Sequence, residues 1–376
     1  MQENFFDGDL DSPVVSILLG GKRPKYTVLE ETLGRYLLNC CVGEEKEVTM
    51  FFNLNSLFKL LFNDYAIERL TRGEIKRNPF ALAFELLQLC AHYRNYIWKY
   101  NIKTSIVFFY SDEKCIEKTN TYVSYKEKLY NKQLNPLIAE FELIRNYVKS
   151  NILLASRIAL RIPNTYFVNT GSIDPEVWPY AFIKEGKVNC TSFIVSLFTS
   201  DYQYLTLDTT YPCCILQPNA QHTKLITKSN FYSIILKDIK SLKDKAHLLN
   251  INLIPYLIAL IGSEDFSISG IPKMRIGRAM TKLLGYEERG LIGEGTPSKE
   301  ILLSLVEDNY KNIIEINWNT LNYESYYKKI TDTEMFKVEN QIEDINEPGI
   351  IPEVNSKYFC DTPIDTKMIF AGEGQY

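Results

Sequence analysis

A glycine-rich, basic stretch between residues 270 and 282 has residue types that could bind phosphate. Gly270 and Gly277 bracket a short turn, and glycines allow a phosphate group to approach main-chain N–H groups. The N-terminus of the helix expected after the turn also favours an anion. The basic side chains expected on the same side are Lys273, Arg275, Arg278 and Lys282.

Two helices must position this turn. Apolar residues from Leu253 to Ile261 recur at helical spacing, and Gly262 is expected to end the first helix. A second helix is expected from Arg278 to about Leu284, with Gly285 ending it. The stretch from residue 250 to 286 therefore predicts a helix, a glycine-rich turn and a second helix. An ordinary helical hairpin without a ligand has the same pattern.

The preceding part of the chain predicts an α/β fold. Continuous apolar runs at 48–54, 105–110 and 192–198 indicate buried strands, and helical patterns at 56–70 and 79–100 separate the first two. We expect the three strands to be parallel neighbours in one sheet with helices on both faces. Shorter elements are expected as a strand at 166–168, a helix at 175–184 capped by Asp174, an edge strand at 213–216 and a helix at 229–249.

The segment organisation follows from these patterns. Residues 1–47 form an N-terminal extension, 48–228 the α/β domain and 229–331 a helical segment with the hairpin. Residues 332–376 form an extended, acidic tail, because residues 334–376 contain nine acidic and three basic side chains. Spaced apolar residues in this tail, from Phe336 to Phe370, predict that it contacts other subunits of an assembly. Packing against its own domain is the alternative.

The composition excludes several classes of protein. The net charge of −4 argues against a general nucleic-acid coat, although a local basic site is compatible with it. Eight cysteines without a C-x-x-C pair suit reduced thiols rather than a zinc site. With an acidic N-terminus and no apolar run of about 18 residues, no membrane role is expected. The many Tyr, Asn, Ile and Lys residues point to an AT-rich genome, such as that of a phage. A cytoplasmic location, in a host cell or a virion, is expected.

Several short motifs resemble the flap endonuclease family, which includes phage 5′ nucleases, and they occur in the family's order. The hairpin matches at Gly262-Ser263, at Gly270-Ile271-Pro272, at Ile276-Gly277 and at Leu283-Leu284. The strand ends match at 52–57 (FNLNSL), 108–110 (FFY) and 199–205 (TSDYQYL), and a helix matches at 125–128 (YKEK). The resemblance covers residues 48–284 and implies a parallel sheet of the 5′-nuclease type.

The resemblance also implies a site of converging carboxylates that holds two divalent ions, but most of the acids are missing here. Other residues stand at the acidic positions: Asn53, Phe109 or Tyr110, Gln203, Ser263 and Phe266. The remaining candidates for catalysis are Asp174, Glu176 and Asp201, with Asp201 also the candidate metal ligand. Each has an ordinary interpretation as a turn, helix-cap or solvated acid. Lys126 and Lys128 could contact DNA phosphates or lie on a solvated helix face.

We therefore expect a catalytically inactive relative of the flap endonucleases, without a cofactor, that contacts duplex DNA or serves as a structural component of a larger assembly. One alternative is an active nuclease with a rearranged Mg²⁺ site built from the three candidates together with Glu264 and Asp265. A second alternative is an interaction protein with no nucleic-acid role. The absence of nucleophile constellations of His, Cys or Ser argues against hydrolases of other types.

Overall fold

A computed structural model describes twelve parts of the chain: residues 36–37, 46–53, 97, 100–110, 164–170, 173–196, 199–218, 223–235, 248, 250–263, 268–292 and 295–330. The N-terminal extension up to residue 35, the helices expected at 56–70 and most of 79–100, and the acidic tail lie outside these residues. The division into domains remains a prediction.

The centre of the fold is a six-stranded sheet with the order β3-β2-β1-β4-β5-β6. Its strands are β1 (Glu47–Asn53), β2 (Lys103–Tyr110), β3 (Thr165–Asn169), β4 (Thr191–Val195), β5 (Cys213–Pro218) and β6 (Thr223–Ile226). All neighbours are parallel except β5 and β6. The α/β class and the three parallel neighbours β1, β2 and β4 are thus confirmed.

The sheet is buried on both faces, which explains the continuous apolar runs. On one face, Phe51 and Phe109 pack against helix α10 (Val177–Lys184) through Phe182 and Trp178. On the other face, Phe193 meets the ring of Tyr36, one of two described residues of an earlier helix. Alternate residues of each strand therefore enter different cores.

Three expectations about this half of the chain need correction. Strand β5 is not at the edge of the sheet, because the unexpected strand β6 pairs with it antiparallel. Helix α10 begins at Val177 rather than Pro175, and its N-cap is Glu176, whose side chain makes no capping bond. Asp174 binds the turn that precedes the helix. Its Oδ1 accepts a hydrogen bond from the N–H of Glu176, and its carbonyl accepts from the N–H groups of Val177 and Trp178.

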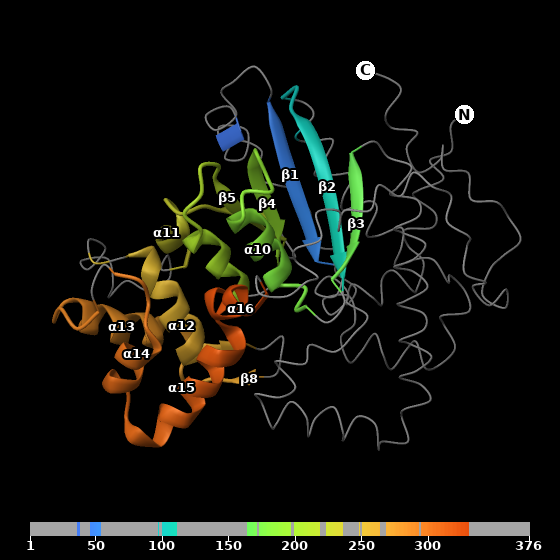
Figure 1. Ribbon diagram of the computed structural model, residues 1–376. Coiled ribbons are helices and arrows are strands. Elements are labelled where there is room, and N and C mark those ends of the chain that lie inside the picture. The colour runs from blue at the N-terminus through green and yellow to red at the C-terminus, as the bar shows by residue number, and fades with distance from the viewer. Residues whose placement is uncertain are drawn as a thin grey trace, which may run out of the picture.

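The second half of the chain is helical. It contains α11 (Phe231–Ile235), the 3₁₀ turn η4 (Ile251–Leu253), α12 (Ile254–Ile261), α13 (Ile276–Glu287), α14 (Lys299–Leu305), α15 (Asp308–Leu321) and α16 (Tyr323–Ile330). The apolar faces of α12 to α15 form a second core around Leu257, Leu283, Leu302 and Ile314. Figure 1 shows these helices together beside the sheet, with α16 returning to α10. None of the described helices has the length and apolar character that a bilayer crossing requires.

Two helices flank the expected turn, but the elements between and after them differ from the expectation. Helix α12 ends at Gly262, where φ is 72° and ψ is −161°, a conformation open almost only to glycine. Two short strands follow, β7 (Gly262–Ser263) and β8 (Ile268–Ser269), which pair antiparallel. Helix α13 does not end at Gly285 but continues to Glu287. A Cβ atom at Gly285 would meet open space, so nothing there interrupts the helix.

Candidate functional site

Strand order places a candidate site where β1 and β4 end. The chain leaves β1 toward β2 and β3 on one side, and it later returns to β4 and β5 on the other. In α/β sheets, ligands bind at such a switch point, outside the carboxyl ends of the strands. Asn53 ends β1, and Ser196 directly follows β4. Both side chains are almost completely buried, so this edge of the sheet is covered.

Asp201 lies at this switch point, in the 3₁₀ helix η2 (Thr199–Thr206) that follows β4. Its carboxylate accepts two hydrogen bonds. Ser196 donates to Oδ2, and the hydroxyl of Tyr323 donates to Oδ1 over 2.6 Å. Only 4% of Asp201 is exposed. Both oxygens of the candidate metal ligand are thus engaged by hydroxyl groups of the protein.

Glu176, the second candidate, lies beside the same tyrosine. The Tyr323 hydroxyl is 3.4 Å from its Oε2, so one phenol lies between two buried carboxylates. The main-chain carbonyl of Glu176 accepts a hydrogen bond from the hydroxyl of Tyr204. Asp174 is buried in the same region, because its charge, like those of Asp201 and Glu176, acts on the pKa of Tyr204. The structure therefore brings the three acidic candidates together.

Gln203 holds the segment that carries Tyr323. Its side-chain nitrogen donates to the carbonyl of Leu321 over 2.7 Å and to that of Ser200 over 3.1 Å. Its side-chain oxygen accepts from the N–H of Tyr323 over 3.2 Å. Gln203 thus uses both ends of its amide to bind the junction between α15 and α16. A carboxylate at this position could accept but could not donate.

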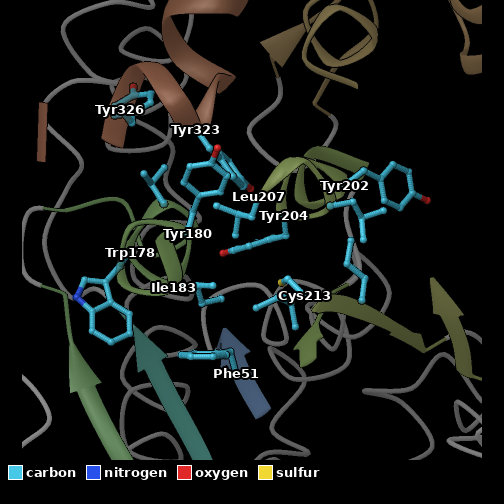
Figure 2. Packing of buried hydrophobic residues seen from close by; sticks show 14 of the residues in the cluster. Phe51, Trp178, Tyr180, Ile183, Tyr202, Tyr204, Leu207, Cys213, Tyr323 and Tyr326 are labelled. Carbon is cyan, nitrogen blue, oxygen red and sulfur yellow. The ribbon is translucent and has the colours of Figure 1, made fainter. Parts of the chain in front are cut away.

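Aromatic rings fill the space around the acids. The ring of Tyr323 lies 5.4 Å from that of Tyr204 and 5.6 Å from that of Tyr180, in both cases edge to face. Figure 2 shows these three rings together above the ends of the strands, with Trp178 and Phe51 below them. The ring of Phe109, at the end of β2, is 6.2 Å from that of Trp178. Aromatic surface therefore packs around the buried acids.

Burial raises the pKa of the Tyr323 and Tyr204 hydroxyls well above the usual value for tyrosine, and the charges of Asp201 and Glu176 raise both further. Both phenols therefore stay protonated at neutral pH and serve as hydrogen-bond donors. Neutral donors stabilise buried carboxylates without adding a charge of their own.

Among the described residues, this arrangement does not fit a pair of catalytic metal ions. No group of three or more His, Cys, Asp and Glu side chains is placed to hold a metal among the residues that the structure describes. Asp174, Glu176 and Asp201 are close together, but protein hydroxyls bind the carboxylate of Asp201 and reach that of Glu176. Glu264 and Asp265, which the rearranged metal site requires, lie outside the described residues, as do Phe266, Lys126 and Lys128.

The basic turn between α12 and α13 forms a second candidate site. Gly270 lies against the end of α12, where an added Cβ would come within 2.2 Å of the main-chain carbon of Ile261. The N–H of Ile271 donates to the carbonyl of Leu260 over 2.9 Å. Lys273 has φ of 62°, and Arg275 is the extended N-cap of α13, whose side chain makes no capping bond. The first turn of α13, with Gly277, follows directly.

The basic side chains of this site form one stripe. Lys273, Arg275 and Arg278 are exposed and Lys282 is partly buried. Arg289, which no sequence motif singled out, is exposed in the turn after α13, and its side chain and that of Lys282 both lie over the ring of Tyr286. Within the described part of the chain, no carboxylate forms an ion pair with these five side chains. Among the described residues, the positive charges of the stripe are therefore not paired with carboxylates.

Comparison with known proteins gives a likeness of fold. No protein-family model matches the chain, and a search of curated proteins finds no relative. Among solved structures, the chain is similar to a bacteriophage T5 flap endonuclease pseudo-enzyme complexed with product DNA and metal ions. The identity is 13%, over 88% of this chain and 100% of that chain, with a TM-score of 0.46. It is also similar to the T5 protein crystallised with metal ions, with 12% identity, coverage of 87% and 99%, and a TM-score of 0.47. A T5 5′-exonuclease with bound zinc has 11% identity, the same coverage and a TM-score of 0.45.

Proposed function

We propose that this chain is a catalytically inactive relative of the flap endonucleases that contacts duplex DNA as a component of a larger assembly. The observation that carries the proposal is the junction of α15 and α16 at the strand-end acids. Gln203 binds this junction with both ends of its amide, and Tyr323 donates to Asp201. Gln203 stands where the motif resemblance implies a metal-binding acid. An acid at this position could help to bind a cation, whereas Gln203 anchors the start of α16 over the site.

A cleavage assay tests the inactivity. Purified chain with Mg²⁺ or Mn²⁺ is expected to leave flapped and nicked duplexes intact, while an active flap endonuclease cleaves them under the same conditions. Metal-dependent cleavage that Asp201→Ala abolishes would overturn the proposal. That result would favour the rearranged nuclease built from Asp174, Glu176, Asp201, Glu264 and Asp265.

The basic stripe supports the contact with DNA. Residues 1–333 carry a net charge of about +2, since the chain carries −4 and the tail from residue 334 carries −6. Lysine and arginine at a helix N-terminus bind phosphate without reading the base sequence. Affinity for duplex DNA is therefore expected to fall as salt rises, because released counterions drive such binding.

The matched comparison for this contact uses two variants. Lys273→Ala with Arg275→Ala is expected to weaken duplex binding for every sequence and to reduce the salt dependence by about two units of slope. Lys311→Ala is the control, because Lys311 is an exposed lysine on α15 whose charge Asp308 already neutralises at 2.6 Å. Equal affinities for the two variants, or no binding at low salt, would favour an interaction protein without a nucleic-acid role.

The acidic tail supports the assembly. Its composition is too polar to form a core of its own, and its spaced apolar side chains suit an extended segment bound along a partner. Removal of residues 335–376 is expected to leave a folded monomer that no longer associates. Light scattering of the full and shortened chains measures this, and a shortened chain that associates normally would contradict it.

A further inference from the structure

Asn317 links the helical core to the basic turn. It lies on the face of α15 that packs on α12 and β7, and it is completely buried. Its side-chain nitrogen donates to the carbonyl of Ala259 over 2.9 Å and to the carbonyl of Ser269 over 3.2 Å. Both partners are main-chain groups of the hairpin, so α15 contacts the turn through this amide.

The two carbonyls lie on opposite sides of the chain reversal. Ala259 is in the last turn of α12, whose final carbonyls have no partner within the helix. Ser269 ends β8 and immediately precedes Gly270. Close to both residues in the chain, the N–H of Ile271 donates to the carbonyl of Leu260. Asn317 therefore connects the last turn of α12 to strand β8 through two hydrogen bonds.

The position needs a side chain with two donors. Both contacts of the amide nitrogen are oxygens, so the opposite orientation of the amide would place Oδ1 against two carbonyl oxygens. No described residue donates to the buried Oδ1 of Asn317. Leaving a buried acceptor without a donor is unfavourable, and an apolar side chain would have no such acceptor. The two hydrogen bonds of Asn317 thus stabilise the turn, while its buried Oδ1 is unfavourable for the core.

We infer that Asn317 is a positioning residue for the DNA contact, and this inference rests on the proposed function of the basic stripe. Lys273 and Arg275 follow Ser269 by a few residues. By fixing Ser269 against the end of α12, Asn317 sets where these two charges stand relative to the N-terminus of α13. It touches no DNA itself.

The test compares two buried changes in the same helical core. Asn317→Ala removes both hydrogen bonds to the turn. Leu302→Ala removes a completely buried apolar side chain of α14 from the same core without removing a hydrogen bond to the turn. Duplex affinity is measured at a temperature where both variants are fully folded. Asn317→Ala is expected to weaken binding about tenfold, which corresponds to about 1.4 kcal/mol, and Leu302→Ala less than about twofold. Equal affinities would overturn the inference.

Hydrogen exchange keeps the inference testable whether or not DNA binds. In Asn317→Ala, two amides of the turn are expected to exchange faster: that of Ile271, which bonds to Leu260 of α12, and that of Met274, which bonds to Ile271. The amide of Glu288, which bonds to Leu284 at the end of α13, is expected to exchange as in the unmodified chain. Unchanged protection of Ile271 would refute the role of Asn317. If the unmodified chain binds no DNA, the proposed function fails, while the exchange result still decides whether Asn317 fixes the turn.

Discussion

The hydroxyl of Tyr323 donates a hydrogen bond of 2.6 Å to Oδ1 of Asp201, although 122 positions separate the two residues in the chain. Asp201 belongs to the short 3₁₀ helix after β4, and Tyr323 begins α16. The contact therefore joins the carboxyl edge of the sheet to the end of the helical half. It also places a neutral phenol between two buried carboxylates, because Glu176 lies 3.4 Å from the same oxygen.

Removing only this hydroxyl is expected to destabilise the protein. Tyr323→Phe keeps the ring contacts but leaves the carboxylate of Asp201 without one of its two hydroxyl donors. The expected loss is about 1–3 kcal/mol of the free energy of unfolding, measured by urea denaturation. Tyr211→Phe is the control, since Tyr211 is 43% exposed. If the two variants unfold at the same urea concentration, the hydrogen bond contributes nothing to stability.

Gln203 gives a second prediction, about the identity of the side chain. Gln203→Glu keeps the shape but places an acceptor against the carbonyls of Leu321 and Ser200. We expect a loss of more than about 1 kcal/mol in the free energy of unfolding, and we expect no gain of nuclease activity. Gln217→Glu is the control, because Gln217 is partly exposed and its oxygen accepts from the Tyr202 hydroxyl at 3.4 Å. A stable, active Gln203→Glu variant would contradict this account.

Alkaline pH is expected to destabilise the fold through the buried tyrosines. The pKa values of Tyr204 and Tyr323 are raised by burial, and next by Asp201 and Glu176, so the folded state keeps both protons when the unfolded state begins to lose them. Their contribution to stability is complete below the unfolded pKa of about 10 and falls as pH rises above it. Each retained proton adds about 1.4 kcal/mol per pH unit to the slope. Urea midpoints between about pH 9 and pH 11 should fall less steeply for Tyr323→Phe than for the unmodified chain.

The two glycines Gly270 and Gly285 should respond to alanine in opposite directions. An alanine Cβ at Gly270 would clash with the main chain of Leu260 and Ile261, whereas at Gly285 it would meet nothing within 4 Å. Gly285→Ala is expected to stabilise α13 by about 1 kcal/mol, because glycine is a poor helix former. Gly270→Ala is expected to destabilise the protein by more than about 1 kcal/mol and to weaken duplex binding. Thermal unfolding measures the change in stability of both variants. A stabilised Gly270→Ala variant would show that the turn is not close-packed.

Strands β1, β2 and β4 were predictable because each is an apolar run that is almost completely buried. The turn was predictable because Gly262 and Gly270 are needed for a positive φ and for a close approach of main chains. Strand β6 was missed, since its four residues TKLI contain no clear alternation. Helix α13 was predicted too short because a glycine inside a helix is unfavourable but does not end it.

The site was only half visible in the sequence. The motif positions predicted that Asn53 and Gln203 replace acids. They did not predict the hydrogen bonds that Gln203 makes instead. Its partners are main-chain groups of residues 321 and 323, which no local pattern connects to residue 203. Tyr323 is one of 25 tyrosines, and nothing in its neighbourhood marks it as the residue that reaches Asp201. Tertiary packing, which local residue spacing does not encode, decides such pairings.

The position of α16 in the chain has a consequence for synthesis. A ribosome makes the six strands up to Ile226 almost a hundred residues before it reaches Tyr323. N-terminal parts of a chain generally begin to fold while the rest is being made. On a nascent chain, the contacts of the Tyr323 hydroxyl with the carboxylates of Glu176 and Asp201 therefore cannot form until α16 has left the exit tunnel. Translation of α16 is the step that closes this edge of the sheet.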